Sequence, residues 1–133
     1  MALKLGEKAQ ILKTVTEEDV FKCAEMTGDF NPIHMDEMVA KSAGFSGRIA
    51  HGVLSIGMIS AVLGTKMPGQ GTILLEQNFV YKMPVFMGDT VKAVCEVSEI
   101  INEVKGIYRI DTKCFNQDEK LLLDGYAVVK YIG

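Results

Sequence analysis

The stretch from His51 to Leu63 constrains the fold more than any other feature, because it carries no charged residue on any side. An α-helix that is apolar all round must be buried all round. Small residues keep such a helix slim enough to pack closely against a sheet, and the stretch contains Ser55, Gly57 and Ala61. The sequence therefore predicts a central helix that is buried in the fold.

Five other runs are typical of strands. In each of them apolar residues alternate with polar ones or follow a turn signal, as expected for strands that cover a core. By residue number these runs are 8–13, 73–83, 91–98, 107–115 and 121–132. About five antiparallel strands and one buried helix are best accommodated by a curved sheet wrapped around the helix. We therefore expect an α+β fold.

The first half of the chain predicts two helices ahead of the central one. Thr16 can cap the first, since three acidic residues follow it in the first turn, and Gly28 is a natural stop. Asp36 can cap a second, short helix that ends near Gly44. No repeat, low-complexity tract or linker composition divides the sequence, so we expect residues 1–133 to form a single domain.

Composition and charge narrow the possible partners. Of the 133 residues, 48% are hydrophobic and 23% are charged, which suits one globular core. The formal net charge is −3 and the 14 basic residues are scattered, so neither nucleic-acid binding nor membrane insertion is expected. The charged N-terminus does not fit a signal peptide. Because the three cysteines show no CxxC spacing, we expect reduced thiols and a cytoplasmic location.

The loop from Thr27 to His34 carries the residues most able to do chemistry. It gathers a carboxylate, an amide and an imidazole, at Asp29, Asn31 and His34. Pro32 prevents the preceding helix from continuing, so the loop has a defined shape. Asp29 and His34 can then take a proton from water with one member and deliver a proton with the other. A purely structural interpretation is also open, in which Asp29 caps a backbone amide and His34 is a surface residue.

The full motif narrows these alternatives. The sequence Gly28-Asp29-x-Asn31-Pro32-x-His34, followed by Ala50-His51-Gly52, closely resembles the (R)-specific enoyl-CoA hydratases, also called the MaoC-like dehydratase family. The likeness continues through the uncharged helix to Gly64, through residues 75–81 and through residues 83–91. It therefore covers most of the chain in the right order.

The resemblance implies a hotdog fold that assembles as a homodimer or a dimer of dimers. It also implies roles for individual residues. Asp29 and His34 match the positions that hold and activate the catalytic water, and Asn31 matches the position whose amide helps to order the site. Gly52 matches the glycine whose backbone N–H binds the thioester carbonyl, and Ser60 falls where some members carry a serine near the site.

The activity implied by the resemblance is reversible, (R)-specific hydration of trans-2-enoyl-CoA to (R)-3-hydroxyacyl-CoA. Coenzyme A is then part of the acyl-CoA substrate, and no cofactor is expected. Asp29, His34 and His51 are not expected to hold a metal, since they lack an HExxH spacing and cysteine support.

Three other functions compete with this one. A 3-hydroxyacyl-(acyl-carrier-protein) dehydratase of fatty-acid or polyketide synthesis would run the same chemistry on another carrier. An acyl-thioester hydrolase on the same fold would not need the loop that holds Asp29 and His34. A non-catalytic acyl-CoA-binding hotdog module would be expected to have lost one of these two residues. The loop thus favours a hydratase or dehydratase over the other two classes.

Overall fold

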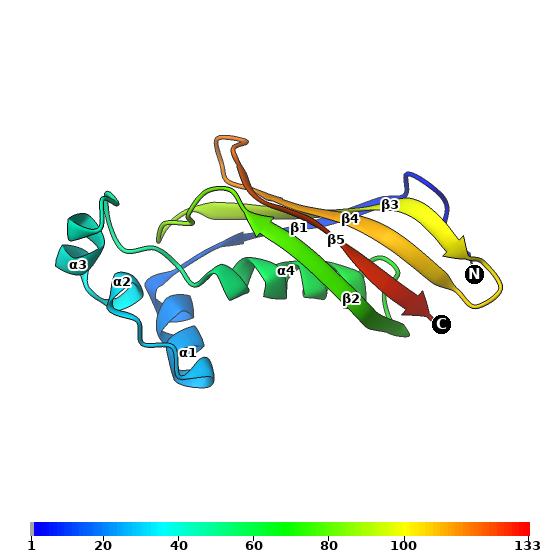
Figure 1. The fold of residues 1–133 in the computed structure, drawn as a ribbon, viewed down its shortest axis with the longest axis horizontal. Coiled ribbons are helices and arrows are strands. Elements are labelled where there is room, and N and C mark those ends of the chain that lie inside the picture. The colour runs from blue at the N-terminus through cyan, green and yellow to red at the C-terminus, as the bar shows by residue number, and fades with distance from the viewer. Residues whose placement is uncertain (1) are drawn as a thin grey trace.

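The computed structural model describes residues 2–133, which form one antiparallel sheet and four helices (Figure 1). The strands are β1 (Lys8–Thr14), β2 (Thr72–Tyr81), β3 (Thr90–Asn102), β4 (Ile107–Phe115) and β5 (Leu121–Tyr131). The helices are α1 (Glu17–Thr27), α2 (Pro32–Met35), α3 (Glu37–Ser42) and α4 (Gly52–Thr65). The strand order is β1-β3-β4-β5-β2, so β1 and β2 lie at the two edges of the sheet.

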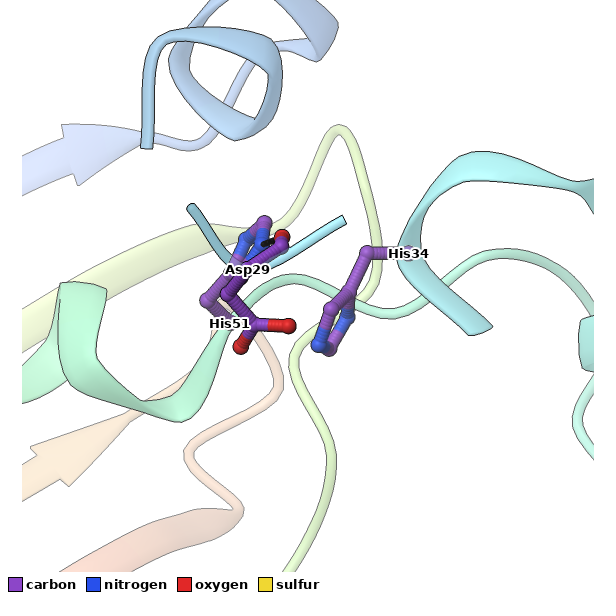
Figure 2. A group of neighbouring side chains, drawn as sticks. All are labelled: Asp29, His34 and His51. Atoms are coloured by element: carbon purple, nitrogen blue, oxygen red, sulfur yellow. Dashed lines mark hydrogen bonds between the residues drawn. The ribbon is translucent and has the colours of Figure 1, made fainter. Parts of the chain in front are cut away.

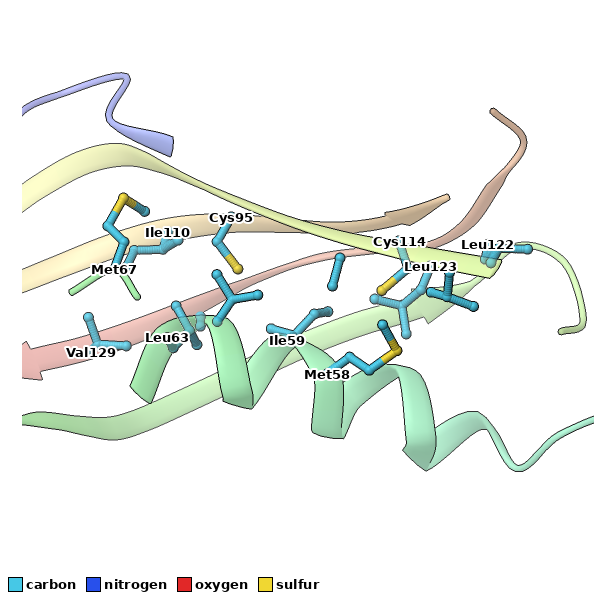
Figure 3. Close-up of a cluster of buried hydrophobic side chains, with 14 of the residues drawn as sticks. Met58, Ile59, Leu63, Met67, Cys95, Ile110, Cys114, Leu122, Leu123 and Val129 are labelled. Carbon is cyan, nitrogen blue, oxygen red and sulfur yellow. The ribbon is translucent and has the colours of Figure 1, made fainter. Parts of the chain in front are cut away.

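Helix α4 runs along one face of the sheet, and the core lies between them (Figures 1 and 3). Buried side chains alternate along β3 and β4, as a strand with one covered face requires. The helix contributes Met58, Ile59, Val62 and Leu63 to the same cluster. This arrangement confirms the predicted α+β hotdog fold, with five strands wrapped around a long helix.

The prediction that α4 is buried on every side was wrong for a single chain. Its buried residues lie toward the sheet, whereas Val53, Gly57 and Ser60 are exposed. One sheet can cover only one face of a helix, so the other face of α4 stays open. The absence of charge on that open face indicates that something other than this sheet covers it.

Strand β2 presents a second exposed apolar surface. None of its residues is buried, and its large side chains are about 37–52% exposed. They are Ile73, Leu74, Leu75, Phe79, Val80 and Tyr81. Because β2 pairs with β5 on one side only, its other edge has free backbone groups.

The helices that precede α4 carry the loop motif. Helix α1 begins as expected, with Thr16 and Asp19 forming a reciprocal capping box. It ends at Gly28, whose φ of 78° lies in the left-handed region. The sequence pattern does not predict the short helix α2, because a proline ends the helix before it more clearly than it indicates a new one. Instead, Asn31 caps α2 and Pro32 occupies its first turn, a position that proline favours.

Within residues 2–133, no helix is both long enough and apolar enough to cross a membrane.

Candidate active site

The loop between α1 and α2 is held by short side-chain bonds to its own backbone. The N–H of Asp29 donates to Oγ1 of Thr27 at 3.2 Å. Oδ1 of Asp29 accepts from the N–H of Asn31 at 3.2 Å, and Oδ1 of Asn31 accepts from the N–H of Ile33 at 3.2 Å. These bonds fix the direction of the Asp29 carboxylate, although the residue itself is exposed.

His34 projects from α2 and is only 8% exposed. Its Nδ1 lies 2.7 Å from the carbonyl oxygen of Ile49. A carbonyl oxygen can only accept, so Nδ1 carries the proton. Nε2 of the neutral ring is left with a lone pair that can accept a proton. The structural interpretation of His34 as a surface residue is therefore wrong, whereas Asp29 does accept from a backbone amide.

His51 completes a compact group with Asp29 and His34 (Figure 2). Each of the three side chains offers one nitrogen or oxygen ligand atom, and these atoms lie within 4.8 Å of one another. The rings of His34 and His51 have centroids 3.9 Å apart and planes tilted by 32°. Figure 2 shows the carboxylate of Asp29 facing the ring of His34. The structure thus brings the predicted acid–base pair together across one loop.

The N-terminus of α4 lies beside this group. His51 is the N-cap residue, and its side chain makes no capping hydrogen bond within residues 2–133. In the same part of the chain no protein group accepts from the N–H of Gly52. This free donor lies at the positive end of the helix dipole, where it favours negative charge. A Cβ on Gly52 would lie 2.6–2.7 Å from atoms of the Tyr81 side chain, so a larger residue there would have to displace that side chain.

An apolar cavity of about 430 Å³ joins His34 to the start of α4. Most of its wall is hydrophobic, as expected for a pocket that takes an acyl chain or a similar ligand. The residues that line it include His34, Phe45, Ile49, Gly52, Val53, Ser55, Tyr81, Met83, Leu122 and Leu123. The cavity therefore connects the possible proton acceptor at His34 to the free N–H at Gly52.

The structure does not bring Ser60 into this cavity. Ser60 is exposed on the open face of α4, whereas Ser55 is buried and lines the cavity. Ser60 follows Ser55 by five positions, a rotation of roughly 140° around the helix, which explains why the two serines lie on different faces.

Sequence reasoning also missed Ser55 as a cavity residue and predicted no role for His51 at the site. One signal was available at each position. Ser55 lies three residues after Gly52, on the same side of the first turn. His51 stands at an N-cap, where Ser, Thr, Asp or Asn is preferred.

The cysteines do not supply a nucleophile at this site. Burial raises the pKa of both Cys95 and Cys114 to about 12, so each is a neutral thiol near pH 7. All three cysteines are free and buried. The remaining candidate chemistry is proton transfer by Asp29 and His34.

The side chain of Arg48 bonds to both α1 and α2. Its guanidinium lies 2.7 Å from the Glu17 carboxylate and donates to the carbonyl of Met35, which links α1 to α2. These contacts give Arg48 a structural role in the helices that precede α4.

Comparison with known proteins identifies the family. A family model described as MaoC like domain matches residues 4–114. An (R)-specific enoyl-CoA hydratase from Rhodospirillum rubrum is 41% identical over 127 residues, which cover 96% of this chain and 87% of that protein. A mitochondrial 3-hydroxyacyl-(acyl-carrier-protein) dehydratase from Arabidopsis thaliana is 31% identical, over 94% of this chain and 75% of that protein.

A solved structure agrees with these matches. The (R)-hydratase from Aeromonas caviae, described as involved in PHA biosynthesis, superposes with a TM-score of 0.92 at 39% identity and covers 97% of each chain. The chain therefore belongs to the MaoC-like dehydratase family.

Proposed function

We propose that this chain is a hydro-lyase that adds water reversibly to trans-2-enoyl-CoA and forms (R)-3-hydroxyacyl-CoA. The observation that carries the proposal is one apolar cavity with His34 and Gly52 in its wall. The carboxylate of Asp29 lies beside His34, and Gly52 supplies its N–H at the start of α4. The relatives with about 40% identity are named for this activity.

The protonation state of His34 determines how a water molecule is held. Nε2 of His34 is an acceptor, since Nδ1–H is used by the carbonyl of Ile49. The Asp29 carboxylate is also an acceptor, and its Oδ1 already receives the N–H of Asn31. A water between them donates one O–H to each, which leaves its lone pairs free to attack C3. Water loses one proton and C2 gains one, so the pair as a whole gains and loses none.

Gly52 serves the other end of the reacting group. When water adds to C3, negative charge develops on the thioester carbonyl oxygen as an enolate. The N–H of Gly52 can donate to that oxygen at the positive end of α4. A fixed donor of this kind is typically worth about 3–4 kcal/mol in the transition state. Asn31 supports the site indirectly, because its amide caps α2 and so positions His34.

The proposal is tested by following the conjugated double bond of crotonyl-CoA in the ultraviolet. Purified protein should remove the absorbance, and protein with Asp29→Asn should remove it far more slowly. An unchanged absorbance with the folded wild-type protein would refute hydration of short enoyl-CoA esters.

A second function shares this chemistry and differs in the carrier. One relative, at 31% identity, is named as an acyl-carrier-protein dehydratase. The same assay with crotonyl-acyl-carrier protein distinguishes the two. We propose coenzyme A as the carrier, and activity confined to the carrier-protein substrate would favour the dehydratase.

We further propose that two chains pair through β2 to form a homodimer, alone or within a dimer of dimers. The free edge of β2 and its exposed apolar side chains support this assembly. A second chain beyond β2 would also cover apolar surface that one sheet leaves open. We also propose that Ser60, which is exposed on the open face of α4, contacts substrate within such an assembly.

The chain is proposed to act as one domain in the cytoplasm. Strand β5 extends past the region matched by the family model and lies between β4 and β2, so the sheet needs it. Three free, buried thiols suit a reducing compartment.

A further inference from the structure

We propose that His51 is a positioning residue for the hydration reaction. Its side chain bonds to the backbone of Asp29 and packs against the ring of His34. This inference rests on the proposed function and adds a third residue to it. His51 is assigned no contact with substrate here; it acts through the two residues that hold the water.

The place of His51 in the chain already sets it apart. It is the N-cap of a helix of 14 residues, where a short polar side chain would normally bond to the free N–H groups of the first turn. Its side chain makes no such bond within residues 2–133. The imidazole therefore does not cap α4, and its ring nitrogens are left for contacts outside the helix.

The ring of His51 instead contacts the loop that follows α1. Its Nε2 lies 2.8 Å from the carbonyl oxygen of Asp29, a residue 22 positions earlier. Because this oxygen can only accept, Nε2 carries the proton and donates. The dashed line in Figure 2 marks this bond. It ties the backbone of Asp29 to the start of α4, and so to the donor at Gly52.

The same ring also supports His34. The two ring centroids are 3.9 Å apart, and His51 is only 1% exposed. The buried ring of His51 therefore packs against the ring of His34. The bond from Nδ1 of His34 to the carbonyl of Ile49 restrains it from the other side. His34 is thus held between a carbonyl and an imidazole.

One feature of His51 is unfavourable for stability alone. Its Nδ1 is buried and has no hydrogen-bond partner among residues 2–133. A buried polar atom without a partner costs free energy, and an apolar ring of similar shape would avoid that cost. The imidazole differs from such a ring in its Nε2–H donor, which is the group that holds Asp29.

Two substitutions separate the donor from the ring. His51→Phe keeps a buried aromatic ring against His34 and removes the bond to Asp29. His51→Gln loses the ring and keeps an amide N–H that reaches about as far as Nε2. If the donor positions Asp29, His51→Phe should lower kcat on crotonyl-CoA by on the order of 10-fold to 10²-fold with little change in KM, because a small misplacement of reacting groups is that costly. His51→Gln should recover a substantial part of the loss.

The double variant His51→Phe with Asp29→Asn tests whether His51 acts through Asp29. In the Asp29→Asn background, His51→Phe should then lower kcat by a much smaller factor than it does in the wild-type background. A folded His51→Phe protein with wild-type kcat, a His51→Gln protein no better than His51→Phe, or fully additive losses would each overturn the inference. These outcomes require a wild-type protein that hydrates crotonyl-CoA, so they are distinct from failure of the proposed function.

A measurement on the unmodified protein guards against variants that do not fold. The chain has 2 histidines, so its imidazole nitrogen NMR spectrum contains two ring patterns. When both rings are neutral we expect one protonated at Nδ1, for His34, and the other protonated at Nε2, for His51. Two rings in the same tautomer would contradict the contacts on which the inference depends.

Discussion

Backbone carbonyls set the chemistry of both histidines at the scale of single residues. Ile49 O receives Nδ1–H of His34, and Asp29 O receives Nε2–H of His51. The two rings are therefore opposite tautomers, although they lie against each other. Only His34 lines the cavity, and its free Nε2 is the nitrogen that can act on a bound water.

Removing either member of the acid–base pair should reduce turnover strongly. We expect Asp29→Asn and His34→Gln each to lower kcat by about 10²–10⁴-fold, the usual scale for a positioned acid or base. The double variant should lose far less than the product of the two factors, since both groups hold one water. A folded Asp29→Asn protein with near-normal kcat would remove Asp29 from the mechanism.

Gly52→Ala should reduce activity through a steric effect. The new Cβ would lie 2.6–2.7 Å from the Tyr81 ring, which must move within the cavity beside the oxyanion donor. Gly64→Ala is a matched control in the same helix, because nothing lies within 4 Å of a Cβ there. The control should keep its kcat and gain up to roughly 0.5–1 kcal/mol in the free energy of unfolding. Equal kcat values for the two variants would show that Gly52 has no special place in the reaction.

Removal of metal ions should leave activity unchanged. Asp29, His34 and His51 offer three ligand atoms within 4.8 Å, so the prediction from sequence that they hold no metal needs a direct test. Protein dialysed against a chelator should hydrate crotonyl-CoA at the untreated rate. A loss that zinc or another divalent ion restores would show that the group is a metal centre.

Helix α4 and strand β2 share one property at the scale of elements, which is apolar surface that the single chain leaves exposed. Both elements also contribute to the cavity, through Gly52 and Ser55 on α4 and Tyr81 on β2. A partner chain that pairs along β2 would therefore influence the shape of the site as well as the stability of the fold.

A charge on the β2 edge should separate the chains. In light scattering at micromolar concentration, the wild-type protein should have at least twice the 14.6 kDa mass of one chain. Val80→Lys, on β2, should lower that mass, because a lysine on an edge strand opposes pairing. Leu12→Lys, at an exposed apolar position on the opposite edge strand β1, should not. A wild-type monomer would contradict the proposed assembly.

Local patterns predicted most elements well, for physical reasons that can be named. The capping box at Thr16 and the alternation along β3 and β4 each depend on neighbours in sequence. Local patterns did not predict helix α2. Proline ends a preceding helix, but it is also favoured in the first turn of a new one, and here Pro32 follows the N-cap residue Asn31. The half-exposed state of α4 depends on how much surface one sheet can cover, which periodicity does not reveal.

The site was predictable in part at the scale of the whole molecule. The loop motif predicted that Asp29 and His34 act together, and the contact group of Figure 2 brings them within reach of one water. The bond from His51 to Asp29 joins residues 22 positions apart. No local pattern encodes that contact, because it depends on how α4 docks against the loop.

The geometry of the whole site should enforce a single product. The carbonyl of a flat enoyl group is proposed to be fixed at Gly52, at the start of α4. Asp29 and His34 approach from the adjoining loop, so water reaches C3 from one direction. The proposed (R) configuration rests on relatives about 40% identical to this chain, which are named as (R)-specific hydratases.

The most direct test is the identity of the product formed from crotonyl-CoA. The hydration reaction is coupled to dehydrogenases specific for each 3-hydroxybutyryl-CoA enantiomer, while a thiol reagent monitors free coenzyme A. Hydration by Asp29 and His34 predicts the (R) product with no release of coenzyme A, since neither residue attacks the thioester. Formation of the (S) product would contradict the proposed stereochemistry, and steady thiol release would show that the chain is a hydrolase.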